Sequence, residues 1–362
     1  MRLVILTTGG TGGHVFPALA VAEELRRRHP GLELLFVGGR HGREAEFAAR
    51  AGIPFVGLPV RGFLGRGPRA VGAAFGLARA LVRSWWMLSR RRPDVVVGFG
   101  GYAGFAPVAA AALRGVPCAL HEQNSLPGSA NRLLGRWVDR VFLSFPDEAG
   151  VFDPGRSRVT GNPVRAAIRE AGAAGAARPA GRRVLVAGGS LGARAINEAV
   201  AASLEGLRAR GFSLWHQTGT DDLGAMRAAY ARAGWSAEQA RVEPFIDDMA
   251  AAYAWADLVL CRAGATTVAE LAVMGKPSVL VPFPHATHDH QTANARRLER
   301  AGAALLLAQD ILAATDLPGA LDALFAEPGR LERMGAAART LGAPDAAKTL
   351  ADAIEALAAR AA

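Results

Sequence analysis

The feature that most constrains the fold is a repeated pattern: in each half of the chain, a short apolar segment runs into a glycine-rich turn. Leu3–Thr7 precedes the turn Gly9–Gly13 (Gly-Gly-Thr-Gly-Gly), and Val184–Ala187 precedes the turn Gly188–Gly192 (Gly-Gly-Ser-Leu-Gly). The starts of the two turns are separated by about half of the 362 residues. A buried strand that ends in a glycine turn and opens a helix is the first part of a βαβ unit. The sequence therefore predicts two α/β domains in tandem.

The rest of the chain alternates in the same way. Further strands are predicted at Leu32–Val37, Asp94–Gly98, Cys118–His121, Arg140–Ser144, Ser213–Gln217, Leu258–Cys261 and Ser278–Val281. Helical stretches are predicted at His14–Arg28, Arg43–Ala51, Ala193–Arg210, Thr266–Met274, His290–Arg300 and Asp345–Arg360. This alternation predicts parallel sheets covered by helices on both faces, with the carboxyl ends of the strands facing a central cleft.

The domain boundaries follow from the same pattern. We expect a first domain at 1–165 and a second at 183–344. The stretch 166–182 is rich in Ala and Gly and has no apolar periodicity, so it is predicted to be a linker. Whether the last helical stretch, 345–362, returns to the first domain is left open.

Composition excludes several classes of protein. Hydrophobic residues make up 51% of the chain, so a large core is available. Cys118 and Cys261 are the two cysteines, too few for a disulfide framework or a Cys-rich zinc module. No uncharged apolar run reaches ~18 residues, so no spanning helix is predicted, and the strand at 2–7 leaves no room for a signal peptide. We expect a cytoplasmic or peripheral protein.

The formal net charge of +10 favours anionic partners, such as phosphorylated substrates or lipid head groups. No RNA-binding aromatic signature or zinc-finger spacing is present, so nucleic-acid binding is not expected. Residues 63–92 mix Trp85, Trp86 and other apolar residues with arginines. Such a stretch fits either a core helix with solvated arginines or a helix at a membrane interface, and both interpretations stay open.

Polar residues follow several predicted strands of the first half. Gly9–His14 opens a helix but is not the Gly-x-Gly-x-x-Gly fingerprint of dinucleotide binding, so a nicotinamide cofactor is disfavoured. Gly98–Tyr102 is a second glycine turn, and His121–Asn124 (His-Glu-Gln-Asn) ends another strand. Helix capping could account for Asn124. Three polar clusters at three strand ends nevertheless favour a binding site.

The second half carries similar signals. Ser190 and its free backbone amides could hold a diphosphate, and Glu270, one turn into a helix, could accept both hydroxyls of a ribose. A solvated position near the helix start is the alternative for Glu270. Three histidines and an aspartate lie within 285–290, but their spacing does not suit a zinc site. Sugar or phosphate recognition by Gln291 and Asn294 fits this segment better.

Taken together, these motifs resemble the MurG family, glycosyltransferase family 28. The resemblance covers Gly9–His14, Gly100–Tyr102, His121–Asn124, Gly161–Arg165, Gly188–Ala193, Phe245–Met249, Cys261–Glu270 and His290–Asn294, in the same order. It implies the GT-B fold, in which two Rossmann-like domains flank a cleft. It also implies transfer of N-acetylglucosamine from UDP-N-acetylglucosamine to lipid I, undecaprenyl-diphospho-N-acetylmuramoyl-pentapeptide, in peptidoglycan synthesis. A UDP-sugar enzyme with another lipid acceptor is the alternative.

The resemblance also implies site residues. Ile246 would meet the uracil, Glu270 the ribose, and Ser190 with the turn Ala265–Thr266 the diphosphate. The donor site would also include Thr11, Gly12, Gly13, Asn124, Arg165, Thr267, Val268, Ala269 and Gln291. The acceptor would dock near Gly9, Gly10, Gly100, Gly101 and Tyr102. His290 departs from the pattern, because some members of the family have Gln there.

Inversion at the anomeric carbon needs a base, and His14 and Glu122 are the two candidates. His14 is favoured because imidazole titrates near neutral pH. Helix N-termini near Ser190 and Thr266 could stabilise the departing UDP, and the chain has no Asp-x-Asp motif, so no metal or other cofactor is predicted. The lipid acceptor implies a peripheral location on the cytoplasmic face of the inner membrane, held to anionic lipid through 63–92. Other proteins of cell-wall synthesis are further candidate partners.

Overall fold

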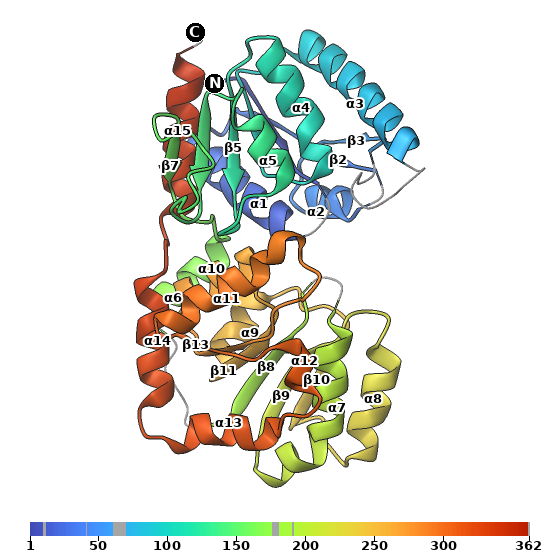
Figure 1. Cartoon of the computed structure of the whole chain (residues 1–362), viewed down its shortest axis with the longest axis vertical. Coiled ribbons are helices and arrows are strands. Elements are labelled where there is room, and N and C mark those ends of the chain that lie inside the picture. Colours follow the sequence, from blue (N-terminus) through green and yellow to red (C-terminus); the bar gives the residue numbers. More distant parts are fainter. Residues whose placement is uncertain (10–11, 41, 61–69, 176–180, 190–191, 361–362) are drawn as a thin grey trace. The chain divides into compact units, whose positions relative to one another are not determined.

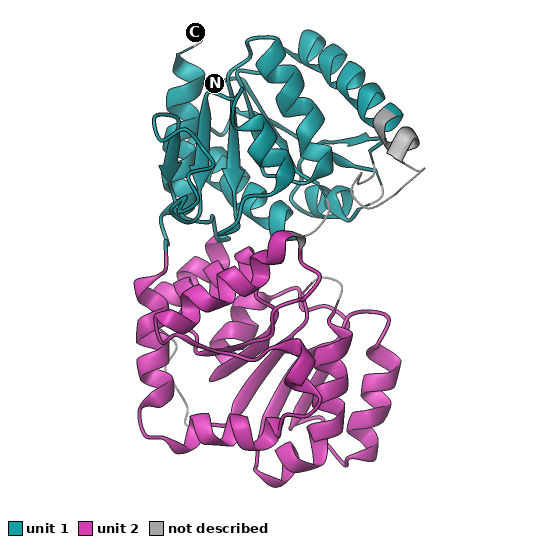
Figure 2. Ribbon diagram, viewed as in Figure 1, with its two compact units in different colours: residues 1–165, 343–362 teal, residues 166–342 magenta. Residues whose placement is uncertain are grey.

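The chain folds into two α/β units (Figures 1 and 2). The structure, a computed structural model, describes residues 1–9, 12–40, 42–60, 70–175, 181–189 and 192–360, with side chains at all of these except 70–74 and 287. Unit 1 consists of Met1–Arg165 and Ala343–Ala362, and unit 2 of Ala166–Gly342.

The described part of unit 1 contains a parallel sheet of seven strands in the order β3-β2-β1-β4-β5-β6-β7. The strands are β1 (Leu3–Thr7), β2 (Glu33–Gly39), β3 (Phe55–Leu58), β4 (Val95–Gly98), β5 (Cys118–Glu122), β6 (Arg140–Leu143) and β7 (Ser157–Val159). The helices are α1 (Gly12–Arg28), α2 (Glu44–Arg50), α3 (Ala70–Arg91), α4 (Tyr102–Leu113), α5 (Ser129–Leu134) and α15 (Ala346–Ala359). Figure 1 shows α3, α4 and α5 next to one another over the sheet.

Unit 2 repeats this arrangement with a parallel sheet of six described strands, in the order β10-β9-β8-β11-β12-β13. The strands are β8 (Arg183–Ala187), β9 (Ser213–Gln217), β10 (Ala240–Glu243), β11 (Leu258–Cys261), β12 (Ser278–Leu280) and β13 (Ala304–Leu306). The helices are α6 (Ala166–Ala174), α7 (Arg194–Ala209), α8 (Leu223–Arg232), α9 (Met249–Trp255), α10 (Ala265–Met274), η2 (Thr287–Asp289), α11 (His290–Arg300), α12 (Gln309–Leu312), α13 (Leu317–Ala326) and α14 (Arg330–Thr340).

The strand order confirms the predicted pair of Rossmann-like domains, because each unit places its first strand at the centre, beside its fourth. The central strands β1, β4, β8 and β11 are buried along almost their whole length. Both faces of such strands are covered by helices, which explains why their sequences are continuous Val, Ile and Leu runs rather than alternating ones.

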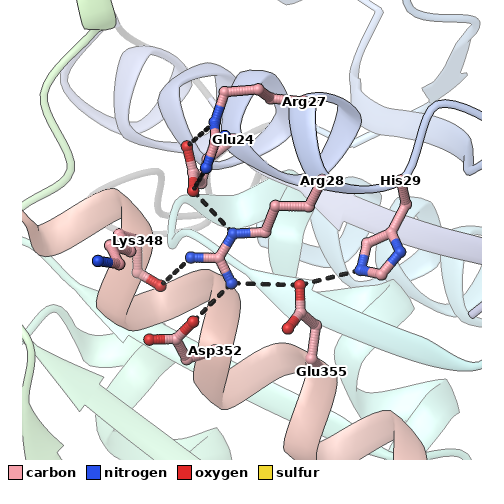
Figure 3. Close-up of polar contacts among 7 residues, drawn as sticks. All are labelled: Glu24, Arg27, Arg28, His29, Lys348, Asp352 and Glu355. Atoms are coloured by element: carbon pink, nitrogen blue, oxygen red, sulfur yellow. Dashed lines mark hydrogen bonds and ion pairs between the residues drawn. The ribbon is translucent and has the colours of Figure 1, made fainter.

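The C-terminal helix α15 belongs to unit 1, where it packs on α1. Leu350 and Ile354 are fully buried on its inner face. Arg28, at the end of α1, reaches across to α15 and donates hydrogen bonds to Asp352 (2.5 Å), Glu355 (3.2 Å) and the carbonyl oxygen of Lys348 (3.1 Å) (Figure 3). The chain therefore returns to the first unit through its last helix.

Arg28 also forms an ion pair with Glu24, which lies one turn earlier on the same helix. Glu24, almost fully buried, accepts from Arg28 Nε (2.7 Å) and from Arg27 (2.8 and 3.0 Å) (Figure 3). These two guanidinium groups lower the pKa of Glu24 to about 2. His29 Nε2 lies 3.0 Å from Glu355 at the edge of this cluster.

The predicted linker is wrong over its first half, because residues 166–174 form α6. Ile168 and Gly172 are buried, and a Cβ on Gly172 would lie 2.7 Å from the carbonyl oxygen of Val273 in α10. Ile168 is the one large apolar side chain among the buried residues of α6, and the helix otherwise packs by close backbone approach at Gly172, so the segment shows no apolar periodicity. Residues 176–180 of the predicted linker lie outside the described part of the chain.

Candidate functional site

The glycine turns after β1 and β4 are packed directly against each other. The Gly9 amide donates to the Gly100 carbonyl oxygen (3.0 Å). Gly101 has φ +77°, and a Cβ there would lie 2.2 Å from the carbonyl oxygen of Gly9. Only glycine can occupy such a position. The two predicted acceptor turns, which lie far apart in the sequence, therefore form one surface at the carboxyl edge of the sheet.

His14 lies beside this surface, in the first turn of α1. A Cβ on Gly100 would come within 3.2 Å of the imidazole ring, so the backbone of the second turn lies against the ring edge. His14 Nδ1 lies 2.8 Å from Oε1 of Gln123, and Gln123 Nε2 lies 3.0 Å from Nδ1 of His121. His121 Nε2 in turn lies 3.0 Å from the carbonyl oxygen of Gly161. Complete burial lowers the pKa of His121 to about 4, so its ring is neutral at pH 7.

Glu122, the other candidate base, is buried and occupied on both carboxylate oxygens. Oε1 accepts from the backbone and side-chain nitrogens of Asn124 (3.0 and 3.2 Å). Oε2 accepts from the Gly128 amide (3.0 Å) and from Asn131 Nδ2 (2.8 Å). This carboxylate therefore organises the loop after β5.

The remaining predicted residues of unit 1 lie around α1 and α4. Gly12 and Gly13 begin α1, and Arg165 stacks on Phe16 of the same helix, with the guanidinium carbon 4.4 Å from the ring centre. Tyr102 is exposed at the start of α4. Gly10 and Thr11 lie outside the described residues.

The glycine turn of unit 2 is held against the end of β9. A Cβ on Gly192, where φ is +78°, would lie 2.3 Å from the Thr218 carbonyl oxygen, and Gln217 Nε2 donates to the Gly189 carbonyl oxygen (2.7 Å). Asn197 Nδ2 donates to the same Thr218 carbonyl (2.8 Å). The turn is thus held by backbone packing at Gly192 and by a side-chain hydrogen bond at Gly189. Ser190 itself lies outside the described residues.

Helix α10 begins at the carboxyl end of β11 and has features of an anion site. Its N-cap is Gly264, a residue with no side chain to cap the helix, and its first turn contains no acidic residue. The neighbouring helix α9, by contrast, is capped by Asp248, which accepts from the Ala251 amide (2.9 Å). The positive end of a helix dipole favours a bound anion, and here no carboxylate of the first turn opposes it.

Glu270 is buried on α10, with 4% of its surface exposed, which excludes the interpretation of this residue as a solvated helix position. Its Oε2 accepts from the Tyr253 hydroxyl (2.9 Å), which comes from α9. Burial raises the pKa of the Cys261 thiol, at the end of β11, to about 12, and the negative charge of Glu270 acts in the same direction. Ile246, also buried, lies in the loop between β10 and α9.

The other predicted donor residues lie on α10 and α11. Ala265, Thr266 and Val268 are buried in the first turns of α10, while Thr267 and Ala269 are partly exposed. Gln291 Oε1 accepts from the Phe283 amide (3.0 Å), and the fully buried Asn294 donates to the Ala263 carbonyl oxygen (3.2 Å). Within the described residues, no group of three or more His, Cys, Asp or Glu side chains could hold a metal ion.

Helix α3 presents a separate surface. Its inner face carries the buried residues Ala80, Ser84 and Leu88 against α4. Its outer face exposes Phe75, Val82, Trp85 and Trp86. Three guanidinium groups lie over these aromatic rings, from Arg79 on Phe75, Arg90 on Trp86 and Arg114 on Trp85. No helix in the described ranges is both long and apolar enough to cross a membrane, and residues 63–69 of this stretch lie outside those ranges.

Two polar side chains of the unit 1 site were not predicted individually. Gln123 and His121 belong to the His-Glu-Gln-Asn cluster, but the cluster alone does not tell which of its members face His14. Asn131, which donates to Glu122, lies on α5 and carried no signal in the sequence.

Comparison with family models gives two matches. Residues 4–143 match the glycosyltransferase family 28 N-terminal domain, and residues 183–350 match the glycosyltransferase family 28 C-terminal domain. The two matched ranges lie in units 1 and 2, apart from a short segment at the end of the second match.

Curated relatives match the chain over nearly its whole length. A protein of Nitratidesulfovibrio vulgaris (strain DP4) is 60% identical over 97% of this chain and 96% of its own. A protein of Solidesulfovibrio magneticus is 54% identical over 99% of both chains. Both are named UDP-N-acetylglucosamine–N-acetylmuramyl-(pentapeptide) pyrophosphoryl-undecaprenol N-acetylglucosamine transferase. Among solved structures, Acinetobacter baumannii MurG superimposes with a TM-score of 0.75 at 34% identity, covering 98% of this chain and 100% of that one.

Proposed function

The chain belongs to glycosyltransferase family 28, and from this premise we propose that it transfers N-acetylglucosamine from UDP-N-acetylglucosamine to lipid I and so forms lipid II for peptidoglycan synthesis. The observation that carries the proposal is the 60% identity, over nearly the full length, to a protein named for this reaction. The GT-B fold and the two predicted substrate sites, one in each unit, agree with it. A different lipid acceptor is not favoured, because curated relatives named for this acceptor match both units.

The proposed reaction is a single in-line displacement. The 4-hydroxyl oxygen of the muramoyl sugar attacks the anomeric carbon of N-acetylglucosamine, and the bond from that carbon to the β-phosphate oxygen breaks. UDP leaves with the electron pair, and the hydroxyl proton passes to a base. Because the donor is α-linked, one displacement gives a β-linked product.

His14 is the proposed base. Its ring is half-buried beside the glycine turns at Gly9 and Gly100, which pack against each other. Glu122 is less suited, since hydrogen bonds from Asn124, Gly128 and Asn131 occupy both of its oxygens. A base needs a free electron pair within hydrogen-bonding distance of the proton that it removes.

The proposed donor site is mainly on unit 2. The buried Glu270 carboxylate would accept the ribose hydroxyls, and Ile246 would meet the uracil through its backbone. The first turn of α10, at Thr266, would bind the diphosphate, and the helix dipole would stabilise its growing negative charge as the sugar leaves. Helix amides can supply this stabilisation without a metal ion, and metal independence therefore stays a prediction.

The proposed membrane contact is the outer face of α3. Trp85 and Trp86 would lie among the lipid head groups, and the arginines beside them would meet anionic lipid. The two other apolar residues of that face, Phe75 and Val82, are 66% and 59% exposed, which an ordinary solvated helix face does not explain. This contact would hold the enzyme on the cytoplasmic face of the membrane, where the lipid acceptor is accessible.

Transfer of radiolabelled N-acetylglucosamine from its UDP donor to a short-chain lipid I analogue tests the reaction. We expect a labelled lipid product that depends on the muramoyl 4-hydroxyl, and no product from an analogue deoxygenated at that position. A folded enzyme that binds UDP but labels another lipid and not this one would redirect the proposal to a different acceptor.

A further inference from the structure

A series of hydrogen bonds connects His14 to the backbone of Gly161. It runs through the side chains of Gln123 and His121. We propose that Gln123 and His121 are positioning residues that hold the proton of neutral His14 on Nδ1 and leave Nε2 as the basic nitrogen. The catalytic role in this inference rests on the proposed function, but the arrangement of the protons follows from the hydrogen bonds and the burial of His121.

At Gly161, the inner end of this series of hydrogen bonds, only one assignment is possible for His121. The Gly161 carbonyl oxygen can only accept, so His121 Nε2 donates to it (3.0 Å). A neutral imidazole carries one N–H, and the fully buried His121 is neutral, since burial lowers its pKa to about 4. Its Nδ1 must therefore accept a hydrogen bond.

The orientation of the Gln123 amide follows. Its Nε2 donates to His121 Nδ1 (3.0 Å) and to the His121 carbonyl oxygen (3.0 Å). The reversed amide would turn its oxygen toward these two acceptors and lose both bonds. Gln123 is 1% exposed, so water could not replace them. The Gln123 oxygen therefore faces His14.

The outer end of the series is then determined as well. Gln123 Oε1 is an acceptor, so His14 Nδ1 donates to it (2.8 Å). The other ring nitrogen, Nε2, has no hydrogen-bond partner among the described residues and keeps its lone pair. A base in the opposite tautomer would present an N–H to the sugar hydroxyl and could not take its proton.

The surroundings keep this series of hydrogen bonds rigid. Phe99 packs on His121 with ring centres 5.5 Å apart, and the backbone of Gly100 limits the movement of the His14 ring. Thr160 Oγ1 also donates to the Gly161 carbonyl oxygen (3.2 Å) without contributing to the series from His14. Thr160 therefore offers a matched control, because its hydroxyl bonds to the same carbonyl but does not determine the tautomer.

The direct test is long-range proton–nitrogen NMR of the histidine rings in the wild-type protein, with the His14 signals identified by their loss in His14→Gln. We expect neutral His14 to carry its proton on Nδ1. A proton on Nε2 would overturn the inference, whatever the acceptor of the enzyme proves to be.

Variants test the catalytic consequence. Gln123→Leu removes the acceptor for His14, and we expect Nε2-protonated His14 to appear in the spectrum. We also expect kcat to fall by roughly 10- to 100-fold, less than the ~100- to 10,000-fold that a general base contributes, with unchanged KM for both substrates. His121→Phe keeps a ring against Phe99 but frees the Gln123 amide, so it should act in the same direction, and it serves as a second test if Gln123→Leu fails to fold.

Thr160→Val should leave the His14 tautomer and kcat at their wild-type values. A folded Gln123→Leu protein with the wild-type tautomer or the wild-type kcat would overturn the inference. So would a loss confined to KM, because that pattern belongs to a substrate contact. Absence of any transfer by the wild type would count against the proposed function alone, since the NMR result does not depend on the acceptor.

Discussion

At the scale of single residues, the two candidate bases, His14 and Glu122, differ in the hydrogen-bond partners that the fold gives them. His14 could be proposed as a candidate base from the sequence because it follows a glycine turn at a helix start. Side chains alternate between the faces of a strand, but the sequence does not show which partners the His121–Asn124 cluster meets across the fold. The partners of Glu122 at Gly128 and Asn131 come from the next loop and helix, so their contact depends on tertiary structure.

Glu122→Gln separates the two candidate bases. The variant turns an NH₂ group toward the donors that surround Glu122 and leaves at least one buried donor without an acceptor. We expect the free energy of unfolding to fall by about 1–3 kcal/mol, measured by thermal melting, and kcat to fall less than in His14→Ala. Wild-type stability together with a loss of kcat as large as that of His14→Ala would identify Glu122 as the base instead.

Glu270→Gln tests the donor site. A hydrogen bond to a charged acceptor is worth ~1.5–3 kcal/mol, so we expect UDP to bind about 10- to 100-fold more weakly in calorimetry. Tyr253→Phe keeps the carboxylate and removes one bond that orients it, so its effect should be smaller. Wild-type affinity for UDP in a folded Glu270→Gln protein would exclude the proposed ribose contact.

At the scale of elements, the strands that the sequence did not predict are the four at the sheet edges: β3, β7, β10 and β13. Central strands such as β1 and β11 are buried on both faces and appear as continuous apolar runs. The edge strands are short and mostly half-exposed or exposed, so their composition resembles that of loops. Helix α6 was not predicted for a different reason: its buried residues are Ile168 and Gly172, and one large apolar side chain produces no apolar periodicity.

Helix α3 carries the prediction about the membrane. Replacing Trp85 and Trp86 with Ser removes two large interfacial side chains, so binding to vesicles that contain anionic lipid should weaken by at least about tenfold. Sedimentation with vesicles measures this binding. The control is Ile311→Ser, which removes an exposed apolar side chain from unit 2. Unchanged vesicle binding and unchanged activity on a soluble acceptor would refute the proposed contact.

At the scale of the whole molecule, both ends of the chain contribute to unit 1, and the cluster between α1 and α15 makes the stability of that unit depend on pH. Glu24 has its pKa lowered from 4.5 to about 2, so the folded state binds this proton less readily than the unfolded state. The stabilisation is complete above about pH 5 and is lost as the pH falls toward 2. It should amount to about 3 kcal/mol.

Thermal melting between pH 7 and pH 2.5 measures this dependence. Glu24→Gln should be less stable than the wild type at pH 7, and the difference should shrink as the pH falls. A constant difference across the range would show that the Glu24 charge does not contribute through this linkage.

The proposed mechanism is tested by comparing the wild type with His14→Ala in N-acetylglucosamine transfer to the lipid I analogue, with calorimetry of UDP-N-acetylglucosamine binding alongside. We predict a β-linked product from the wild type, and a loss of ~100- to 10,000-fold in kcat for the variant, with donor binding unchanged. Transfer at the wild-type rate by a folded His14→Ala protein would contradict the proposed role of His14 as the base, because the proposed displacement gives that side chain no other role.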